Sequence, residues 1–96
     1  MLPIHWTEKA IEELEERMAF IALRSPRAAE QLLDQVIDAV VPASEHPYIF
    51  RAGRVPGTRE IVAHPNYIVV YRVAADAVIV VQVLHAREQH PLVQPR

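Results

Sequence analysis

The chain has 96 residues, a length at which proteins form one hydrophobic core, so we expect a single domain over residues 1–96. Its hydrophobic fraction of 51% and charged fraction of 23% are typical of globular proteins and exclude a wholly disordered chain. The absence of cysteine excludes a disulfide framework, a thiolate zinc site and a cysteine nucleophile. No apolar run reaches the ~20 residues of a membrane helix, and the start of the chain does not resemble a signal peptide. We therefore expect a soluble, cytoplasmic protein.

The charges are unevenly distributed along the chain. Residues 1–45 contain nine acidic and four basic residues, whereas residues 46–96 contain three acidic residues and six arginines. Because a guanidinium pairs with a carboxylate or a phosphate at two points, this composition favours recognition of such groups. A merely solvated basic face explains the composition equally well.

The first half of the chain predicts a short strand and two helices. Residues 2–6 alternate in polarity, as a strand does. Thr7 is a suitable N-cap for an amphipathic helix that ends near Arg24. Ser25 and Pro26 are typical of the start of a second helix, which we expect Pro42 to stop. The short connection predicts that the two helices form an antiparallel hairpin.

The second half predicts a loop and three strands. Proline and glycine gather between residues 42 and 57, which indicates a loop with Tyr48, Ile49 and Phe50 as an apolar plug. Strands follow at 59–64, 67–73 and 77–84, and tight turns between them predict an antiparallel meander. The last strand is rich in β-branched residues, which favours burial on both faces. We expect an α+β fold in which the helix hairpin covers one face of a curled antiparallel sheet.

Four segments carry a resemblance to a known family: residues 45–48, 53–60, 64–73 and 83–89. They include a Gly-x-Arg step, the strand Tyr-Ile-Val-Val-Tyr-Arg-Val and the ending Leu-His-Ala-Arg. Over nearly its whole length the chain resembles the RelE/ParE superfamily of toxins from bacterial type II toxin–antitoxin modules. The resemblance implies a growth-arresting toxin that a cognate antitoxin neutralises, and contact with operator DNA only through that antitoxin.

The superfamily has two kinds of target. RelE-like members cut mRNA in the ribosomal A site, and ParE-like members poison DNA gyrase. The nucleases carry clustered basic residues on the middle strands and often a tyrosine near the C-terminus. This chain has Ala63 and Ile68 on those strands, no lysine in its second half, no tyrosine after Tyr71 and a pI near 6.2, which suits ribosomal RNA poorly. We therefore expect DNA gyrase as the target. The alternatives are a ribosome-dependent mRNA endonuclease and a degenerate toxin that only binds its antitoxin.

Candidate site residues differ between these readings. In a nuclease, His85 would act as base or acid, Arg59 and Arg87 would hold the phosphate, and Glu88 or His64 would be the second titrating group. More often, such a histidine simply ends a strand and bonds a loop carbonyl. In a binding toxin, five arginines would line one face and contact gyrase or the antitoxin: Arg51, Arg54, Arg59, Arg72 and Arg87. Pairing with nearby acids such as Glu60 is the structural alternative for these arginines.

Other binding chemistry finds little support in the sequence. The five histidines show no metal-ligand spacing, and no glycine-rich phosphate loop precedes a helix, so we expect no metal and no cofactor. The helix pair and the exposed strand edges are the expected landing sites for an antitoxin, because an edge strand presents unpaired backbone groups.

Overall fold

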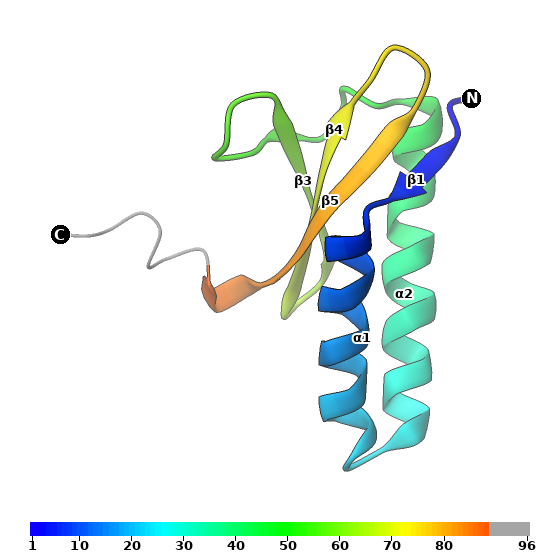
Figure 1. Ribbon diagram of the computed structural model, residues 1–96, viewed down its shortest axis with the longest axis vertical. Helices are drawn as coiled ribbons and strands as arrows, with labels where there is room; N and C mark the ends of the chain where they lie inside the picture. Colours follow the sequence, from blue (N-terminus) through cyan, green and yellow to red (C-terminus); the bar gives the residue numbers. More distant parts are fainter. Residues whose placement is uncertain (89–96) are drawn as a thin grey trace, which may run out of the picture.

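The structure is a computed structural model that describes residues 1–88, with the backbone alone for Glu88. In chain order its elements are β1 (Ile4–Trp6), α1 (Glu8–Ala22), α2 (Pro26–Glu45), β2 (Arg51–Ala52), β3 (Thr58–His64), β4 (Tyr67–Val73), β5 (Val78–His85) and a 3₁₀ turn, η1 (Ala86–Glu88). The strands form one sheet in the order β1-β5-β4-β3-β2, and the two helices lie side by side on one face of it (Figure 1). The predicted α+β architecture is confirmed.

The strands of the meander pair antiparallel, as predicted, and β1 joins the sheet next to β5. This pairing is parallel, with Ile4 opposite Val78 and Trp6 opposite Val80. The sheet is therefore mixed rather than wholly antiparallel. The sequence could not place β1, because its partner lies more than seventy positions away.

Both helices begin where their caps predict. The Thr7 hydroxyl accepts the N–H of Ala10 at 3.1 Å, and the Ser25 hydroxyl accepts that of Ala28 at 3.1 Å. Each cap satisfies a backbone donor that has no partner within its helix. Helix α1 ends at Ala22, two residues before the predicted end.

The prediction that Pro42 stops the second helix is wrong, because α2 continues to Glu45. Pro42 has no N–H to donate to the preceding turn, but its carbonyl still accepts the N–H of His46 at 2.9 Å. The last turn of α2 is held by the residues just before β1. Ser44 and Leu2 exchange two hydrogen bonds, and the Ser44 side chain is buried. Tertiary contacts thus outweigh the local signal.

The main core lies between the helices and the sheet. Its buried side chains come from both layers: Leu14, Leu32, Val36, Val40, Val69, Tyr71, Val78, Val80 and Val83. A smaller cluster of Ile68, Val70 and Leu84 lies apart from the main core. Strand β4 is buried from Tyr67 to Tyr71, and in β5 buried and half-buried residues mix without an exposed one. The prediction that the last strand is buried on both faces is confirmed in part, because Val83 joins the main core and Leu84 the smaller cluster.

The segment between α2 and β3 is not a simple loop. It contains β2, whose two residues pair with Glu60 and Arg59 of β3. Of the predicted apolar plug, only Phe50 packs inward, with its ring edge-on to Tyr71 at 6.2 Å. Tyr48 and Ile49 are 65% and 66% exposed, so the prediction is wrong for these two residues.

Side chains of α1 complete the β5 edge of the sheet where β1 ends. The Glu13 carboxylate accepts the N–H of Val83 at 2.8 Å, and Arg17 Nη2 donates to the carbonyl of Val83 at 3.5 Å. We call this pair of side chains the β5 clip. It satisfies backbone groups that an edge strand otherwise presents unpaired. Within residues 1–88, no helix is long and apolar enough to cross a membrane.

Candidate functional site

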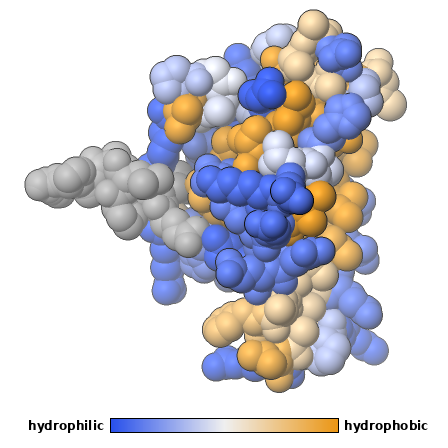
Figure 2. Space-filling view, viewed as in Figure 1, coloured by the Kyte–Doolittle hydropathy of each residue, from blue (hydrophilic) through white to orange (hydrophobic). Residues whose placement is uncertain are grey.

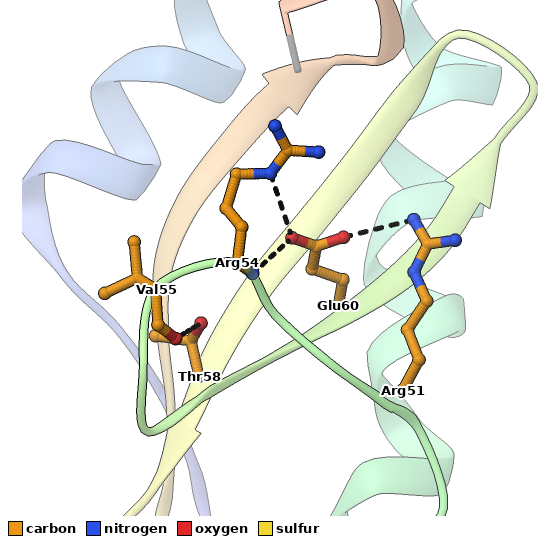
Figure 3. A network of polar contacts seen from close by, with 5 residues as sticks. All are labelled: Arg51, Arg54, Val55, Thr58 and Glu60. Carbon is orange, nitrogen blue, oxygen red and sulfur yellow. Dashed lines mark hydrogen bonds and ion pairs between the residues drawn. The ribbon is translucent and has the colours of Figure 1, made fainter. Parts of the chain in front are cut away.

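A buried carboxylate organises the arginines that precede β3. The Glu60 side chain is 5% exposed and accepts from Arg51 Nη2 at 3.1 Å and from the backbone N–H of Arg54 at 3.3 Å. The Nε of Arg54 lies 3.9 Å from the second carboxylate oxygen (Figure 3). Two guanidinium groups therefore share one carboxylate, which leaves the cluster with a net positive charge.

The turn between β2 and β3 is held from both sides. Thr58 accepts the N–H of Gly53 at its carbonyl and donates its hydroxyl to the carbonyl of Val55 at 2.6 Å (Figure 3). A Cβ at Gly53 would lie 2.2 Å from this hydroxyl oxygen, and Gly57 has φ of 86°, a conformation that favours glycine. Both glycines are thus required by the geometry of this turn.

Arg59 holds the segment that leads into β2. Its Nη1 donates to the carbonyls of Tyr48 at 3.1 Å and Phe50 at 2.7 Å, and its guanidinium lies 5.1 Å from the centre of the Tyr48 ring. The Tyr71 hydroxyl donates to the carbonyl of Pro47. Burial raises the pKa of Tyr71, an effect that the positive charge of Arg59 partly opposes. A cavity of about 230 Å³ opens beside Tyr48 and Arg59.

Aromatic and imidazole rings gather at the opposite end of the sheet. His64, Tyr67 and His85 occupy adjacent positions on β3, β4 and β5. The Tyr67 ring centre lies 5.4 Å from that of His64 and 5.3 Å from that of His85, and Arg17 lies 5.8 Å from it. We call these four residues the histidine cluster.

Backbone contacts orient both imidazoles of this cluster. His64 Nδ1 accepts the N–H of Asn66 at 3.0 Å, and His85 Nδ1 accepts the N–H of Arg87 at 3.1 Å. A nitrogen that accepts a hydrogen bond carries no proton, so a neutral ring carries its proton on Nε2. Both rings are therefore in the same tautomer. His85 does bond backbone at the end of its strand, although to an N–H and not to a carbonyl.

The structure does not bring the three predicted nuclease residues together. Arg59 is paired with Tyr71 and His85 with Tyr67, so they lie four residues apart along β4, or about 13 Å. Arg87 follows His85 closely and is exposed. His64, proposed as a second titrating group, does join His85, whereas the Glu88 side chain lies outside the described part of the chain.

The prediction that five arginines line one face is also wrong. Alternation along β3 places Arg59 on the face opposite to Glu60, and Arg51 and Arg54 go with Glu60. Arg72 is exposed, opposite Thr58, and has no polar partner within residues 1–88, while Arg87 lies at the far end of the sheet. Arg51, Arg54 and Arg72 therefore share one face of the sheet, whereas Arg59 lies on the other face and Arg87 at the far end.

Arg17 belongs to the histidine cluster, although the sequence did not lead us to predict a role for it. A signal was present, because Arg17 lies three residues after Leu14 and four before Ile21, on the apolar stripe of its helix. A basic residue at such a position faces the sheet rather than the solvent. Its stem packs inward and its guanidinium reaches Tyr67 and Val83.

An apolar groove lies between the two helices. It encloses about 390 Å³ and is lined mainly by Trp6, Ile11, Leu14, Met18, Leu33 and Ile37. Ile11 and Ile37 are 42% and 45% exposed, which is unusual for residues so close to the core. Glu15 is the one charged residue in the lining. Within residues 1–88, no group of three His, Asp or Glu side chains is arranged to hold a metal ion.

Comparisons with known proteins agree with this fold. The candidate toxin Y4kP of Sinorhizobium fredii is 38% identical over 91 residues, which cover 94% of each chain. The chromosomal ParDE toxin–antitoxin system of P. aeruginosa contains a chain of similar fold, with a TM-score of 0.77, 20% identity, and coverage of 88% of this chain and 96% of that one. The YoeB/ParE toxin of Agrobacterium tumefaciens has a TM-score of 0.60 and 16% identity, with 88% and 98% covered.

Residues 4–90 match the family described as ParE toxin of the type II toxin–antitoxin system parDE. This match covers most of the chain, and the S. fredii relative is similar over the same extent. The chain therefore belongs to the ParE toxin family, within the RelE/ParE superfamily of type II toxin–antitoxin toxins.

Proposed function

We propose that this toxin arrests growth by binding DNA gyrase, cleaves no nucleic acid itself, and is neutralised by a cognate antitoxin. The observation that carries the proposal is that three of its arginines are engaged in contacts within the fold. Arg59 is bound to two carbonyls and lies about 13 Å from His85 along β4, and Arg51 and Arg54 share Glu60. A metal-free nuclease needs cations at the phosphate beside its acid and base.

A supercoiling assay tests this proposal. The purified toxin should inhibit supercoiling by gyrase, or trap cleaved DNA, at a concentration comparable to that of the enzyme. Addition of the cognate antitoxin should restore the activity. Unchanged supercoiling at a large excess of folded toxin would contradict the proposal, and the absence of growth arrest on expression would favour a degenerate toxin. Because gyrase acts in the cytoplasm, the proposal also implies a cytoplasmic protein.

The antitoxin is proposed to place an apolar segment in the groove between α1 and α2. Exposed apolar side chains such as Ile11 and Ile37 lose contact with water when a partner covers them. Of the five arginines, Arg72 is proposed as a further antitoxin contact, because it is exposed and its guanidinium has no polar partner within residues 1–88.

The histidine cluster supports a second candidate function, a ribosome-dependent mRNA endonuclease. In such a reaction one imidazole takes the proton of the RNA 2′-hydroxyl as its oxygen attacks the phosphorus, and the other gives a proton to the departing 5′-oxygen. His64 and His85 flank Tyr67, and Nδ1 of each accepts a backbone N–H, so the neutral ring carries its proton on Nε2. The imidazole that acts as acid would give up this Nε2 proton. The imidazole that acts as base would first have to release its backbone hydrogen bond, so that its Nδ1 takes the proton of the 2′-hydroxyl. Arg87 is the exposed cation nearest in the chain.

Mapping of transcript ends after toxin induction separates the two candidates. New ends within translated messages, lost in His85→Gln and His64→Gln, would establish cleavage. Asn66→Ala is a matched control, because its side chain is exposed in the same turn while its backbone N–H remains. If no new ends appear while growth still stops, the nuclease candidate is excluded.

A further inference from the structure

Exposed apolar side chains lie around the two-residue edge strand β2. Tyr48, Ile49 and Val55 are 65%, 66% and 57% exposed, and Arg51 and Arg54 lie between them in the chain. We call these five residues the β2 edge surface. Figure 2 shows only a small apolar spot among more polar residues at the turn before β3, apart from the apolar tip of the helix hairpin.

This surface is held rigidly by the contacts behind it. Arg59 fixes the carbonyl of Tyr48 and lies beneath its ring, and Glu60 fixes Arg51 and Arg54. The side chain of Thr58 closes the turn at Val55. A backbone that is already ordered loses little conformational entropy when a partner binds, so such a surface suits recognition. Tyrosine and arginine are also the residues that most often dominate binding energy at protein interfaces.

The charge of this surface indicates what it binds. The surface contains two arginines, Arg51 and Arg54, and no acidic residue, although the chain as a whole has a net charge of −2. Glu60 is buried and is shared between two guanidinium groups, so it neutralises only part of this charge. The complement of such a surface is an apolar side chain surrounded by carboxylates.

We propose that the β2 edge surface is where the toxin docks on its target protein, at a site where carboxylates surround an apolar side chain. The inference rests on the proposed function, since it takes the target to be the gyrase protein rather than the DNA. It separates target binding from antitoxin binding, because none of the five residues lines the groove between α1 and α2.

Substitutions of Ile49 test both parts of this proposal. Ile49→Ser removes the apolar contact, Ile49→Asp also repels carboxylates, and Ile49→Lys attracts them. The expected order of affinity for purified gyrase is Lys, then Ser, then Asp, with Ile49→Asp at least about tenfold weaker than the wild type. Val55→Asp should weaken binding in the same direction. An equal loss in Ile49→Lys and Ile49→Asp would contradict the acidic partner.

Leu23→Asp is the matched control, because Leu23 is an equally apolar residue, 84% exposed, at the tip of the helix hairpin. It should bind gyrase within about twofold of the wild type. Thermal unfolding and antitoxin affinity should be unchanged in every variant, which excludes misfolding as the cause.

The outcomes distinguish the inference from the function on which it rests. If the wild-type toxin does not bind gyrase, the proposed function fails and the inference falls with it. If the wild type binds and Ile49→Asp and Val55→Asp bind equally well, the inference alone is wrong. Binding of the wild type to a gyrase-free DNA duplex, weakened by the same substitutions, would show that the surface binds phosphates instead and would also overturn it.

Discussion

The buried carboxylate of Glu60 connects three parts of the segment before β3: the side chain of Arg51, and the backbone and side chain of Arg54. A buried carboxylate is stable only while such partners surround it. The residue therefore shapes the β2 edge surface without being part of it.

Glu60→Ala should lower the free energy of unfolding by about 2 kcal/mol, since it removes two hydrogen bonds and an ion pair. For a domain of this size the melting temperature should fall by about 10 °C. Glu60→Gln, which keeps an acceptor for the Arg54 N–H, should lose about half as much. Equal stability of Glu60→Ala and the wild type by calorimetry would show that the cluster does not hold the turn.

Tyr71 predicts a dependence of stability on alkaline pH. Burial raises the pKa of Tyr71 above its unfolded value, so the folded chain holds this proton more tightly. The stabilisation is complete below pH 10 and is lost as the pH rises through the folded pKa. Tyr71→Phe should cost about 1 kcal/mol at pH 7, because the carbonyl of Pro47 loses its donor.

The difference between Tyr71→Phe and the wild type should shrink as the pH rises above 10 and through the raised pKa of Tyr71. Denaturant unfolding of both proteins at each pH measures it, and the other tyrosines cancel because both proteins contain them. A difference that stays constant over this range would contradict the role of burial.

At the scale of elements, α1 does more than cover the sheet. The β5 clip ties Glu13 and Arg17, one helical turn apart, to a single residue of the neighbouring strand. This contact sets where along β5 the helix lies. It also gives the backbone of Val83 partners where β1 has ended.

Glu13→Ala should expose the Val83 amide to exchange with solvent. Its hydrogen exchange, followed by NMR, should accelerate by about tenfold, because a buried donor without an acceptor opens more readily. Glu13→Gln should show an intermediate rate, and Glu12→Ala, on the exposed side of the helix, should show none of this effect. Unchanged exchange in Glu13→Ala would show that the clip does not protect the edge.

Most elements were predictable because their signals are local. Thr7, Ser25 and the turn before Tyr67 mark boundaries that the structure repeats. The end of α2 was not predictable, since it depends on Ser44 meeting Leu2 across the fold. The candidate sites were predicted only in part for the same reason. The register of the sheet brings His64 and His85 together, and the same register places Arg59 at a distance from both.

At the scale of the whole molecule, three surfaces lie apart. The β2 edge surface and the histidine cluster occupy opposite ends of the sheet, and the apolar groove lies in the helix layer. Arg54 and Val55 of the β2 edge surface reach the middle of the sheet, where they line a small cavity with Val70 and Leu84. A partner that covers the groove can therefore leave the other two surfaces open, unless it extends along the sheet.

Ile37→Asp should weaken binding of the cognate antitoxin by at least about tenfold, since it places a charge in the apolar groove. Val41→Asp is the matched control, because Val41 is 49% exposed on the same helix and does not line the groove. Isothermal titration of both variants measures the difference. Equal affinities would place the antitoxin elsewhere.

The β5 clip has a consequence for the toxin when it is alone. An unpaired edge strand can form backbone hydrogen bonds with a strand of another chain, and such pairing can start aggregation. The carboxylate and guanidinium of one helix turn occupy that margin in place of a missing strand. These contacts therefore hinder another chain from adding a strand beside Val83.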